Sequence, residues 1–523
     1  MSGEPFVGRA RVNEASREGR DLELDADVVV VGSGAGGAVV AALLAEAGRR
    51  VIVLEEGPNV SVDEIQSMRP SQHMRRAWRD GGMTVAVGVG DTPTINVTMG
   101  RAVGGSSILT GGVCFRTPEH VLSTWEERLG LPQFSPAKLD AYFSEVERAI
   151  HVEEVPVEMR SRSTQLFAEG AEKLGYAIEP LRRNTMGCNG CGRCNFGCPH
   201  GAKLSVDMTY LPRATAAGAE LWSDCLVERV LVEGGRAVGV EGTILTRPRG
   251  LAGKLGFGRA PKLRVRAKQV VIAAGSYHSP LLLERSGVGR ASGQVGRNMT
   301  LHPAFRMFAR FEVRVEGWRG ALQSAYSRAL ESDGITMVGL FVPPGVLAAT
   351  MPGFGTEHVR RAADVPHLAV FGGLIHDEGG GTVRRGPGRE PIVTYRMAPA
   401  DRARIPQIIR TMAEVFFAAG AKEVFPPILG QPGVGPDELR TLDLERIPAL
   451  RLECSSQHPL GSCRMGRRPD DSVVDVDGQA WDVRGLYVAD GSIVPTSLGV
   501  NPQLTIMALA TRIAHGLRER PLP

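Results

Sequence analysis

The sequence has no long hydrophobic run and little net charge. No stretch of about eighteen or more apolar residues occurs, so a transmembrane helix is not expected. Residues 1–26 are polar and mixed in charge, and they lack the apolar core and the twin arginine of a secretion signal. This favours a cytoplasmic protein. The formal charge of +4 over 523 residues argues against nucleic acid as a partner.

The composition is otherwise that of an ordinary soluble globular protein. Hydrophobic residues make up 43% of the chain and charged residues 23%, which is enough apolar material for a sizeable core. The length allows several domains, or one large domain with a second one grown into it. The 65 glycines indicate many tight turns and close backbone contacts.

The N-terminal part of the chain predicts a βαβ unit. Residues 27–31 are an apolar, β-branched run that is typical of a buried strand. An apolar helix follows and ends near Gly48, and residues 51–57 give a second buried strand. The short crossover between two such strands favours parallel pairing.

Three glycines in the pattern G-x-G-x-x-G separate the first strand from this helix. Gly32 permits a tight turn, Gly34 lets the backbone approach a pyrophosphate, and Gly37 lets the helix pack close to the strand. The helix N-terminus supplies unpaired N–H groups for phosphates. Glu55 ends the second strand, where an acid can accept hydrogen bonds from ribose hydroxyls. The pattern predicts a dinucleotide site but does not choose between NAD and FAD.

Later segments predict more of the same α/β domain and then a second lobe. Residues 205–245 alternate like strands around a hairpin turn at Gly234-Gly235, and residues 269–275 form another buried strand. Residues 304–450 contain short alternating runs and a helix over 401–420. We expect this segment to be a mainly β lobe that faces the substrate.

The remaining segments predict two more helices and a return to the first domain. Helices are expected around 61–79 and over 134–151. Residues 485–519 give a strand, a loop with two prolines and an apolar helix. The glycine- and arginine-rich stretches 247–260 and 378–389 are predicted to be surface loops.

Half of the eight cysteines lie close together, in the run C-x2-C-x2-C-x3-C-P. They are Cys188, Cys191, Cys194 and Cys198. Bacterial ferredoxins use this run to ligate iron–sulfur clusters, because thiolates are soft donors for iron. Zinc also takes four thiolates, and a purely structural thiol or disulfide loop is the third interpretation. The absence of a secretion signal makes a disulfide framework the poorer interpretation.

Five stretches resemble, in order, the conserved patterns of the glucose–methanol–choline (GMC) oxidoreductases. They are GRAVGGSSILTGG (100–112), GSYHSPLLLERSGVG (275–289), VGRNMTLHP (295–303), HPLGSCRMG (458–466) and GLYVADGSIVPTSLGVNPQLTIMALA (485–510). Any one of them alone resembles a chance glycine-rich segment, but five in order are specific. The resemblance implies a flavoenzyme that binds FAD.

The resemblance also implies a fold and a set of cofactor contacts. The fold class is α/β, with a discontinuous Rossmann-like FAD domain and a mainly β-sheet substrate domain. The expected divisions are 21–303 for the FAD domain (with the cysteine-rich insertion 187–201), 304–450 for the substrate domain, and 451–523 for the segment that completes the FAD domain. Residues 106–110 contain no histidine that could attach the flavin, so FAD is expected to bind noncovalently. The residues expected at the cofactor are Gly32, Gly34, Gly37, Glu55, Gly104, Gly105, Ser106, Val227, Asp490, Gly491 and Pro502.

The resemblance places the reacting pair on His458 and Asn501. An alcohol must lose its hydroxyl proton as hydride leaves its carbon, and the oxygen must be held. A histidine suits the first task because its ordinary pKa, about 6.5, is near the working pH. A fixed hydrogen-bond donor suits the second task. We therefore expect His458 as the base and Asn501 as its hydrogen-bonding partner, with hydride passing to flavin N5.

The substrate itself is not specified by these patterns. The apolar stretches of 304–450 weakly favour a hydrophobic alcohol over a sugar. An iron–sulfur site would suit a dehydrogenase that passes electrons to an external acceptor, but oxidase and dehydrogenase are not separated. Two rivals stay open, namely a lyase of the same family that uses FAD only structurally, and a flavin-binding scaffold without a substrate of its own.

Overall fold

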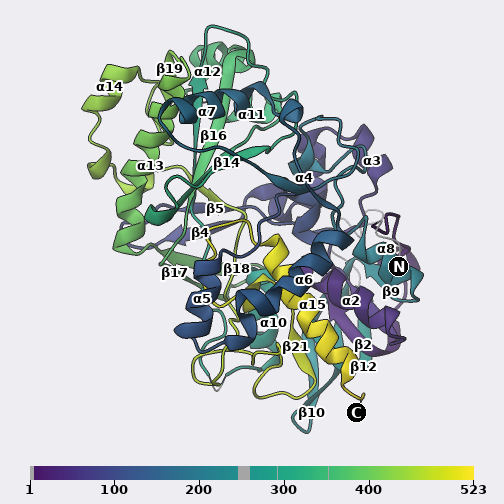
Figure 1. Ribbon diagram of the computed structural model, residues 1–523. Helices are drawn as coiled ribbons and strands as arrows, with labels where there is room; N and C mark the ends of the chain where they lie inside the picture. The colour runs from purple at the N-terminus through teal and green to yellow at the C-terminus, as the bar shows by residue number, and fades with distance from the viewer. Residues whose placement is uncertain (1–4, 246–259, 291, 352, 523) are drawn as a thin grey trace.

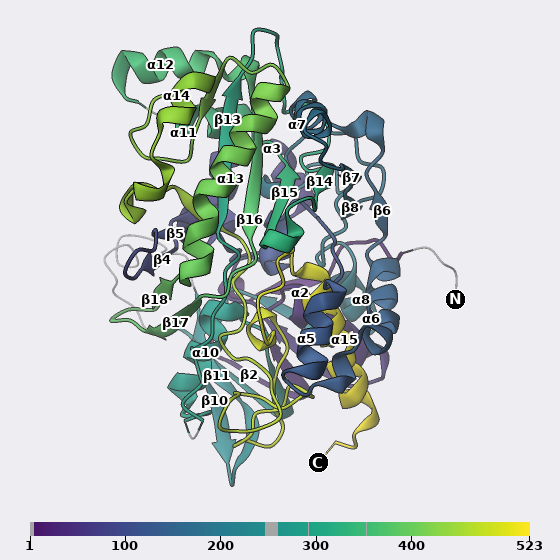
Figure 2. The ribbon, with the colours of Figure 1, turned by 60° about the vertical axis from the view of Figure 1, so that its left-hand side comes forward.

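The computed structural model describes residues 5–245, 260–290, 292–351 and 353–522. Two large sheets organise this part of the chain. In both views most of the second sheet and its helices lie in the upper part of the molecule, and β17 (Gly380–Arg385) and β18 (Pro391–Arg396) reach down to its middle. The first sheet with its helices lies in the lower part, where both termini are (Figures 1 and 2). Almost all of the predicted surface loop 247–260 lies outside the described residues.

The first sheet joins segments that are far apart in the sequence. Its strand order is β1-β9-β3-β2-β12-β11-β10, with β21 beside β12. The bounds are β1 Val12–Glu14, β2 Leu22–Val31, β3 Val51–Leu54, β9 Glu220–Ser223, β10 Cys225–Glu233, β11 Arg236–Ile244, β12 Lys262–Ile272 and β21 Leu486–Val488. Strands β9, β3, β2, β12 and β21 are parallel, which brings their carboxyl ends to one edge.

Helices cover this sheet and begin at the same edge. Helix α2 (Ala35–Glu46) follows β2 and is buried along nearly its whole length, next to α15 (Gln503–Glu519) from the far end of the chain. Figures 1 and 2 show the two lying side by side, with α6 (Pro136–Ala149) against α15. Helix α10 (Gly275–Ser286) follows β12. Because α2 is apolar on all sides, it fits only between a sheet and other helices.

The second sheet has strand order β17-β18-β4-β5-β20-β13-β16-β15-β14-β7, with β19 beside β13. The bounds are β4 Val85–Gly88, β5 Ile95–Val97, β7 Glu179–Pro180, β13 Ala304–Arg310, β14 Ala325–Ser327, β15 Ile335–Gly339, β16 Leu368–Ile375, β17 Gly380–Arg385, β18 Pro391–Arg396, β19 Glu423–Phe425 and β20 Cys454–Ser456. Strands β4, β5 and β7 precede residue 304 and β20 follows residue 450. The expected domain division stays a prediction, but this sheet extends beyond it on both sides.

Helices α13 (Pro399–Ala418) and α7 (Arg162–Lys173) pack on the second sheet around Phe371 of β16. The ring of Phe416 meets that of Phe371 edge-to-face at 4.7 Å, and the ring of Phe167 lies tilted against it at 4.6 Å. The remaining elements are short. They are α1 Ala15–Glu18, α3 Val62–Ser67, α4 Pro70–Ala77, α5 Glu119–Glu127, α8 Tyr210–Ala216, α11 Pro344–Thr350, α12 Gly355–Ala363, α14 Pro436–Thr441, β6 Val152–Glu154 and β8 Arg182–Asn184.

Most of the predicted elements are present. Helix α6 fits the prediction over 134–151, α13 fits 401–420, and β10 and β11 pair up to Glu233–Arg236 around the Gly234-Gly235 turn. Three expectations were wrong. Residues 380–385 of the predicted surface loop 378–389 form β17, which pairs with β18. Residues 61–79 form two short helices because Pro70 begins a new one. Residues 210–216, expected to be extended, form α8, which buries its apolar residues against α2.

In the described residues no helix is both long enough and apolar enough to cross a membrane.

The contact between α2 and the end of β21 predicts a large effect of one added methyl group. A Cβ at Gly36 would lie 1.8 Å from the backbone oxygen of Ala489. We expect Gly36→Ala to lower the free energy of unfolding by about 1–3 kcal/mol and to weaken FAD retention, because a backbone atom cannot rotate away. Urea unfolding and released-flavin fluorescence measure the two effects.

Gly516→Ala is the matched control, because Gly516 also lies in a helix, α15, but has open space where the Cβ would be. We expect it to raise stability by up to about 1 kcal/mol through helix propensity. Equal stability of the two variants would contradict the close packing of α2 on β21.

Candidate active site

A cavity opens where the parallel strands of the first sheet end. Its wall is built by the ends of β2 and β3, the first turns of α2, α10 and α15, and the loop that follows β5. The predicted residues that line it are Gly32, Gly34, Glu55, Gly105, Ser106, Val227, His458, Asp490, Gly491 and Pro502. Gly37, Gly104 and Asn501 are not in its lining. Segments from both ends of the chain therefore meet at one site, which we call the cofactor cavity.

The glycines of this cavity act through turns and close contacts. Gly32 has a φ of +101°, which side chains rarely adopt, and it turns the chain from β2 into α2. A Cβ at Gly37 would lie 2.1 Å from the oxygen of Gly32, so helix and strand touch there. A Cβ at Gly105 would lie 2.8 Å from the Cα of Gly34, so two glycine loops meet at the cavity wall. Because no side chains project from these glycines, a large flat ligand can pack directly against the backbone along this wall.

Glu55 is buried, and its carboxylate holds the cavity wall together. One oxygen accepts from the N–H (3.1 Å) and the hydroxyl (2.7 Å) of Ser33, and the other accepts from the N–H of Gly57 (2.8 Å). The Ser33 oxygen in turn accepts from the N–H of Gly104 at 3.0 Å. Burial raises the pKa of Glu55. Its predicted contact with ribose stays a prediction, and its visible role is to tie three loops together.

Asp490 joins the last segment of the chain to the start of α10. One carboxylate oxygen accepts from the Gly275 N–H (2.8 Å) and the Ser279 hydroxyl (2.5 Å), and the other accepts from the Ser492 N–H (2.8 Å). Pro502 precedes α15 and lines the cavity, so the positive end of that helix faces the cavity. This position is favourable for negative charge on a ligand.

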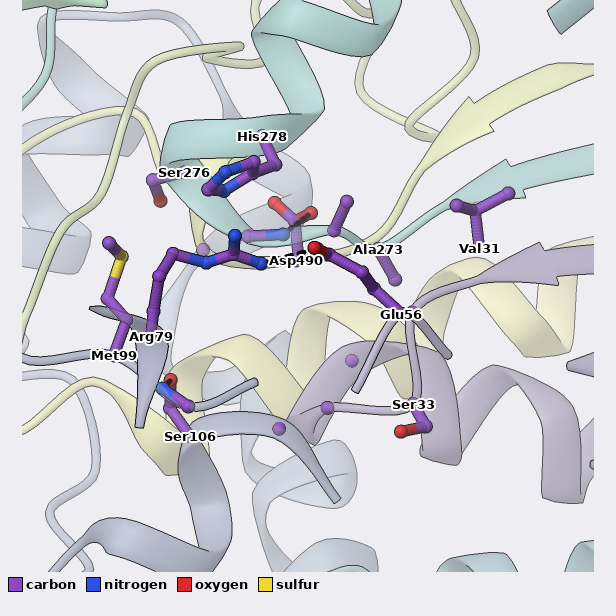
Figure 3. A pocket seen from close by; sticks show the side chains of 18 of the residues that line it. Val31, Ser33, Glu56, Arg79, Met99, Ser106, Ala273, Ser276, His278 and Asp490 are labelled. Carbon is purple, nitrogen blue, oxygen red and sulfur yellow. Dashed lines mark hydrogen bonds and ion pairs between the residues drawn. The ribbon is translucent and has the colours of Figure 1, made fainter. Parts of the chain in front are cut away.

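The structure adds an ionic cluster that the sequence patterns did not reveal. Buried Arg79 pairs with Glu56 (2.5 Å) and Glu390 (2.8 Å), and Glu390 also contacts Nε2 of His278 (3.1 Å). Arg389 pairs with Glu56 at 2.5 Å. Figure 3 shows Arg79 and Glu56 pointing toward each other across the cavity, with His278 above them. The loop between β17 and β18 thereby closes one side of the cofactor cavity.

A second cavity lies beside the second sheet and meets the first one at Gln457 and His458, which line both. We call it the substrate cavity. Most of its wall is apolar, and the apolar side chains include Leu322, Val338, Leu340, Phe341, Val342 and Leu374. Its polar side chains include Asn195, Arg306, Gln323 and Asn501. A ligand in one cavity therefore contacts a ligand in the other near His458.

His458 and Asn501, 43 residues apart, touch at this junction. Nδ2 of Asn501 lies 3.1 Å from Nε2 of His458, and Oδ1 of Asn501 is buried without a partner. The other ring nitrogen of His458 contacts a second histidine, because Nδ1 of His302 lies 3.3 Å from Nδ1 of His458. The structure thus brings the predicted pair together and adds His302, for which the sequence patterns gave no catalytic role.

The hydrogen bonds of His302 fix where the protons lie. Its Nε2 accepts from the backbone N–H groups of Leu498 (2.9 Å) and Gly499 (3.2 Å), so a neutral His302 carries its proton on Nδ1. That proton is donated to Nδ1 of His458. A neutral His458 must then carry its own proton on Nε2, facing Asn501. The Asn501 amide completes the chain by turning its oxygen toward this N–H, which also gives Oδ1 a partner.

Asp377 anchors this histidine pair from behind. Its carboxylate accepts from the backbone N–H groups of Leu301 (2.9 Å) and His302 (3.1 Å) and from the hydroxyls of Ser497 (2.6 Å) and Tyr395 (2.5 Å). Burial lowers the pKa of both His302 and His458 to about 3. Both imidazoles are therefore neutral at working pH.

The structure gives no support for the predicted metal site at the cysteine run. Among the described residues, no group of three or more His, Cys, Asp or Glu side chains is placed to hold a metal ion. Buried Cys194 instead accepts a hydrogen bond from Nη2 of Arg183 at 3.0 Å. Burial opposes ionisation of this thiol, but the charges of Arg183 and Lys203 lower its pKa. The structure supports neither the iron–sulfur prediction nor the zinc prediction.

The glycines of the run serve to dock the loop rather than to surround a cluster. Gly320 donates its N–H to the oxygen of Gly190 at 2.8 Å and forms a bridge with Cys191. A Cβ at Gly192 would lie 2.7 Å from the oxygen of Trp318. The ammonium group of Lys203 donates to the carbonyl of Cys194 (3.0 Å) and to those of Ile108 and Thr110 (both 2.8 Å). The loop is thus fixed between the wall of the substrate cavity and the segment 105–110.

A glycine-lined cavity at the carboxyl ends of parallel strands, with a buried acid after the second strand, defines a dinucleotide-binding α/β protein. The residues present fit FAD, because the wall offers close backbone approach and a helix N-terminus to a long cofactor, and because the cavity continues to a reacting pair. Comparison with known proteins specifies the class. The GMC oxidoreductase family matches residues 26–304 with its N-terminal part and residues 381–510 with its C-terminal part. The chain belongs to the GMC oxidoreductase family, and this supports FAD as its cofactor.

Individual relatives agree with this assignment. An uncharacterized GMC-type oxidoreductase of Mycobacterium tuberculosis is 38% identical over 97% of this chain and 80% of its own length. A long-chain-alcohol oxidase of Arabidopsis thaliana is 28% identical over 95% of this chain and 69% of its own. The fold is similar to that of pyridoxine 4-oxidase from Mesorbium loti, with a TM-score of 0.72, 20% identity, and coverage of 95% and 99% of the two chains.

Buried neutral histidines predict a loss of stability in acid. Burial lowers the pKa of His73 to about 4 and that of His302 to about 3, whereas both take up a proton near pH 6.5 when the chain unfolds. As pH falls below about 6.5, the unfolded chain binds protons that the folded one does not. The free energy of unfolding therefore falls, by up to about 2 kcal/mol per histidine at pH 5. Urea unfolding at pH 7.5 and pH 5 measures the loss.

His73→Leu separates this effect from general acid sensitivity, because neither ring nitrogen of His73 has a hydrogen-bond partner. We expect the variant to lose less stability between the two pH values than the unmodified protein. His200→Leu, at an exposed position, is the control. An unchanged pH dependence in His73→Leu would contradict the assignment.

Proposed function

We propose that the protein oxidises an alcohol to an aldehyde or ketone. The observation that carries this proposal is the contact of His458 and Asn501 at the junction of the cofactor cavity and the substrate cavity. When bound, FAD supplies the acceptor for hydride from the alcohol carbon. The chain supplies the groups that hold the alcohol oxygen.

The hydrogen bonds favour a donor role for His458. In this role the alcohol oxygen replaces Oδ1 of Asn501 as the acceptor of the His458 Nε2–H, and it also accepts from the amide of Asn501. Two donors there stabilise an alkoxide as hydride leaves. The base role predicted for His458 stays a prediction. To act as the base, His458 needs a lone pair on Nε2 and its proton on Nδ1. In the structure, however, Nδ1 is the atom that accepts the hydrogen bond from His302. In the donor role the hydroxyl proton leaves to water or hydroxide as the alcohol ionises.

Three finer points belong to the same proposal. FAD is held noncovalently, which the absence of histidine in residues 106–110 supports. The substrate is a hydrophobic alcohol, which the apolar wall of the substrate cavity and the name of the Arabidopsis relative support. The electrons then pass to an external acceptor. The cysteine run no longer supports this electron transfer to an external acceptor. Oxygen consumption and dye reduction, measured under the same conditions, distinguish oxygen from another acceptor.

The visible spectrum of the purified protein tests the reaction class. We expect flavin bands that bleach anaerobically when a hydrophobic alcohol is added. Trichloroacetic acid should release the flavin, because noncovalent FAD leaves the denatured chain. Flavin bands that no alcohol bleaches would overturn the proposal and favour a lyase or a scaffold.

Two variants of His458 distinguish donor from base. His458→Ala removes both roles, and we expect the limiting rate of flavin reduction to fall by about a hundredfold. The amide of His458→Gln still donates a hydrogen bond but is no base, so we expect it to stay within about tenfold of the unmodified enzyme. Anaerobic stopped-flow absorbance measures both rates.

If Gln is as slow as Ala, His458 is the base and the tautomer derived from His302 is not the reactive one. If neither substitution slows reduction, the reacting pair is misassigned.

A further inference from the structure

Arg306 carries a charge into the substrate cavity that no neighbouring group pairs with. Within the part of the chain that the structure describes, its guanidinium makes no hydrogen bond and lies within 4 Å of no carboxylate, whereas Arg310 on the same strand pairs with Glu423 at 3.1 Å. Its surface remains accessible, yet the protein surrounds it closely enough that desolvation lowers its pKa, although it stays protonated at working pH. A solvent-accessible guanidinium that no protein group neutralises is available to an anionic group of a ligand.

The second sheet aims this side chain into the cavity. Along β13 the side chains of Phe305 and Met307 are buried in the core, so Arg306 projects from the opposite face. Its partner across the ladder is Gly372, where a Cβ would lie 3.4 Å from Cγ of Arg306 and 2.9 Å from the oxygen of Phe305. Glycine at this position lets the stem of Arg306 pack closely against the backbone of β16. The sheet thus fixes where the arginine side chain leaves the strand.

Arg306 also lines a third cavity, which opens toward the surface. This cavity and the substrate cavity share Arg306 and Ser455. The outer lining includes three exposed apolar side chains, Leu450 (82% exposed), Leu429 (50%) and Val85 (42%). We interpret it as the approach to the substrate cavity, so that Arg306 lies between the solvent and the reacting pair.

The register places Arg306 and His458 at opposite ends of the substrate cavity. Ala304 pairs with Ser455, Arg306 lies two residues from this pair along β13, and His458 lies three residues from it in the other direction. At the rise of a β-strand the Cα atoms of the two residues are roughly 16 Å apart. The apolar wall described above spans the space between them. One molecule can therefore have its hydroxyl at His458 and a second polar group at Arg306, joined by an apolar chain.

We propose, on the basis of the alcohol-oxidising function above, that Arg306 binds an anionic group at the far end of the substrate. The preferred substrates are then alcohols whose apolar chain ends in a carboxylate or another anion, such as ω-hydroxy carboxylic acids. A guanidinium binds a carboxylate through two parallel hydrogen bonds, which gives both affinity and orientation. The only acid that lines the outer cavity with it is Glu453, among the described residues, and it lies too far away to form an ion pair.

The experiment compares ω-hydroxy carboxylates with n-alkanols of the same chain length by anaerobic flavin reduction in the holoenzyme. The measured quantity is the ratio of their kcat/KM values at each length. We expect the hydroxy acid to be preferred by about tenfold or more at its best length, as a charge-assisted hydrogen bond provides. In Arg306→Gln we expect this ratio to fall by about tenfold.

Two matched variants control for charge and for folding. Arg310→Gln removes an arginine from the same strand that is already paired and lines neither cavity, so the ratio should not change. Glu453→Gln removes the nearby negative charge, so the ratio should rise. If Arg306→Gln fails to fold, inhibition of the unmodified enzyme tests the role of Arg306 instead. An n-alkanoate should inhibit alkanol oxidation at least about tenfold more strongly than its methyl ester.

The outcomes separate this inference from the proposed function. If neither substrate series bleaches the flavin, the alcohol-oxidising function is wrong. If alkanols bleach it as well as hydroxy acids do, and alkanoates inhibit no better than their esters, the function stands and the role of Arg306 is overturned.

Discussion

The ends of three parallel strands set the position of everything else in the active site. Beyond the last paired residues of β2, β12 and β21 the hydrogen-bond ladder continues, with the Ala273 N–H donating to the oxygen of Val31 (2.7 Å) and the Ala489 N–H to that of Ile272 (2.8 Å). These contacts align three chain segments separated by more than 200 residues each. Only glycine fits where α2 then passes over the carbonyl of Ala489. The cofactor cavity, the Asp490 contacts and the start of α15 all depend on this alignment.

The second sheet completes the site because its strands position His458, His302 and Asp377. Strand β20 leads directly into His458, β13 follows directly after His302, and the loop after β16 carries Asp377. Asn501 comes from the other side, from the segment between β21 and α15. The reacting groups are therefore held at the seam between the two halves, and a shift of either half would change their separation. Buried His302, half-buried His458 and the buried carboxylate of Asp377 are concentrated there.

The part of this architecture that is encoded locally could be predicted from the sequence. The glycines that follow β2, the buried strand 27–31 and the helix after Pro136 each depend on neighbouring residues, and the structure confirms them. The pairing of Arg79 with Glu390 could not be predicted, because 311 residues separate the two and neither belongs to a pattern.

The sequence patterns did not reveal the place of His302 behind His458, and they predicted a metal site at the cysteine run that the structure does not support. The backbone N–H groups that assign the proton of His302 come from a loop nearly 200 residues away, so its place behind His458 required the tertiary structure. The run from Cys188 to Cys198 matches a ferredoxin pattern in spacing. Spacing alone, however, does not show that Arg183 binds one thiol and that the glycines dock the loop on residues 318–320. The ligand geometry of a metal site depends on such contacts more than on the order of the cysteines.

The central claim is that the carbon of an alcohol held at His458 and Asn501 loses hydride to the flavin. Anaerobic stopped-flow reduction with an alcohol deuterated at the carbinol carbon tests it most directly. The account predicts that deuterium slows the bleaching of the flavin severalfold, because cleavage of that C–H bond limits the step. Bleaching at the same rate with protiated and deuterated alcohol over the accessible pH range, or no bleaching with any alcohol, would contradict it.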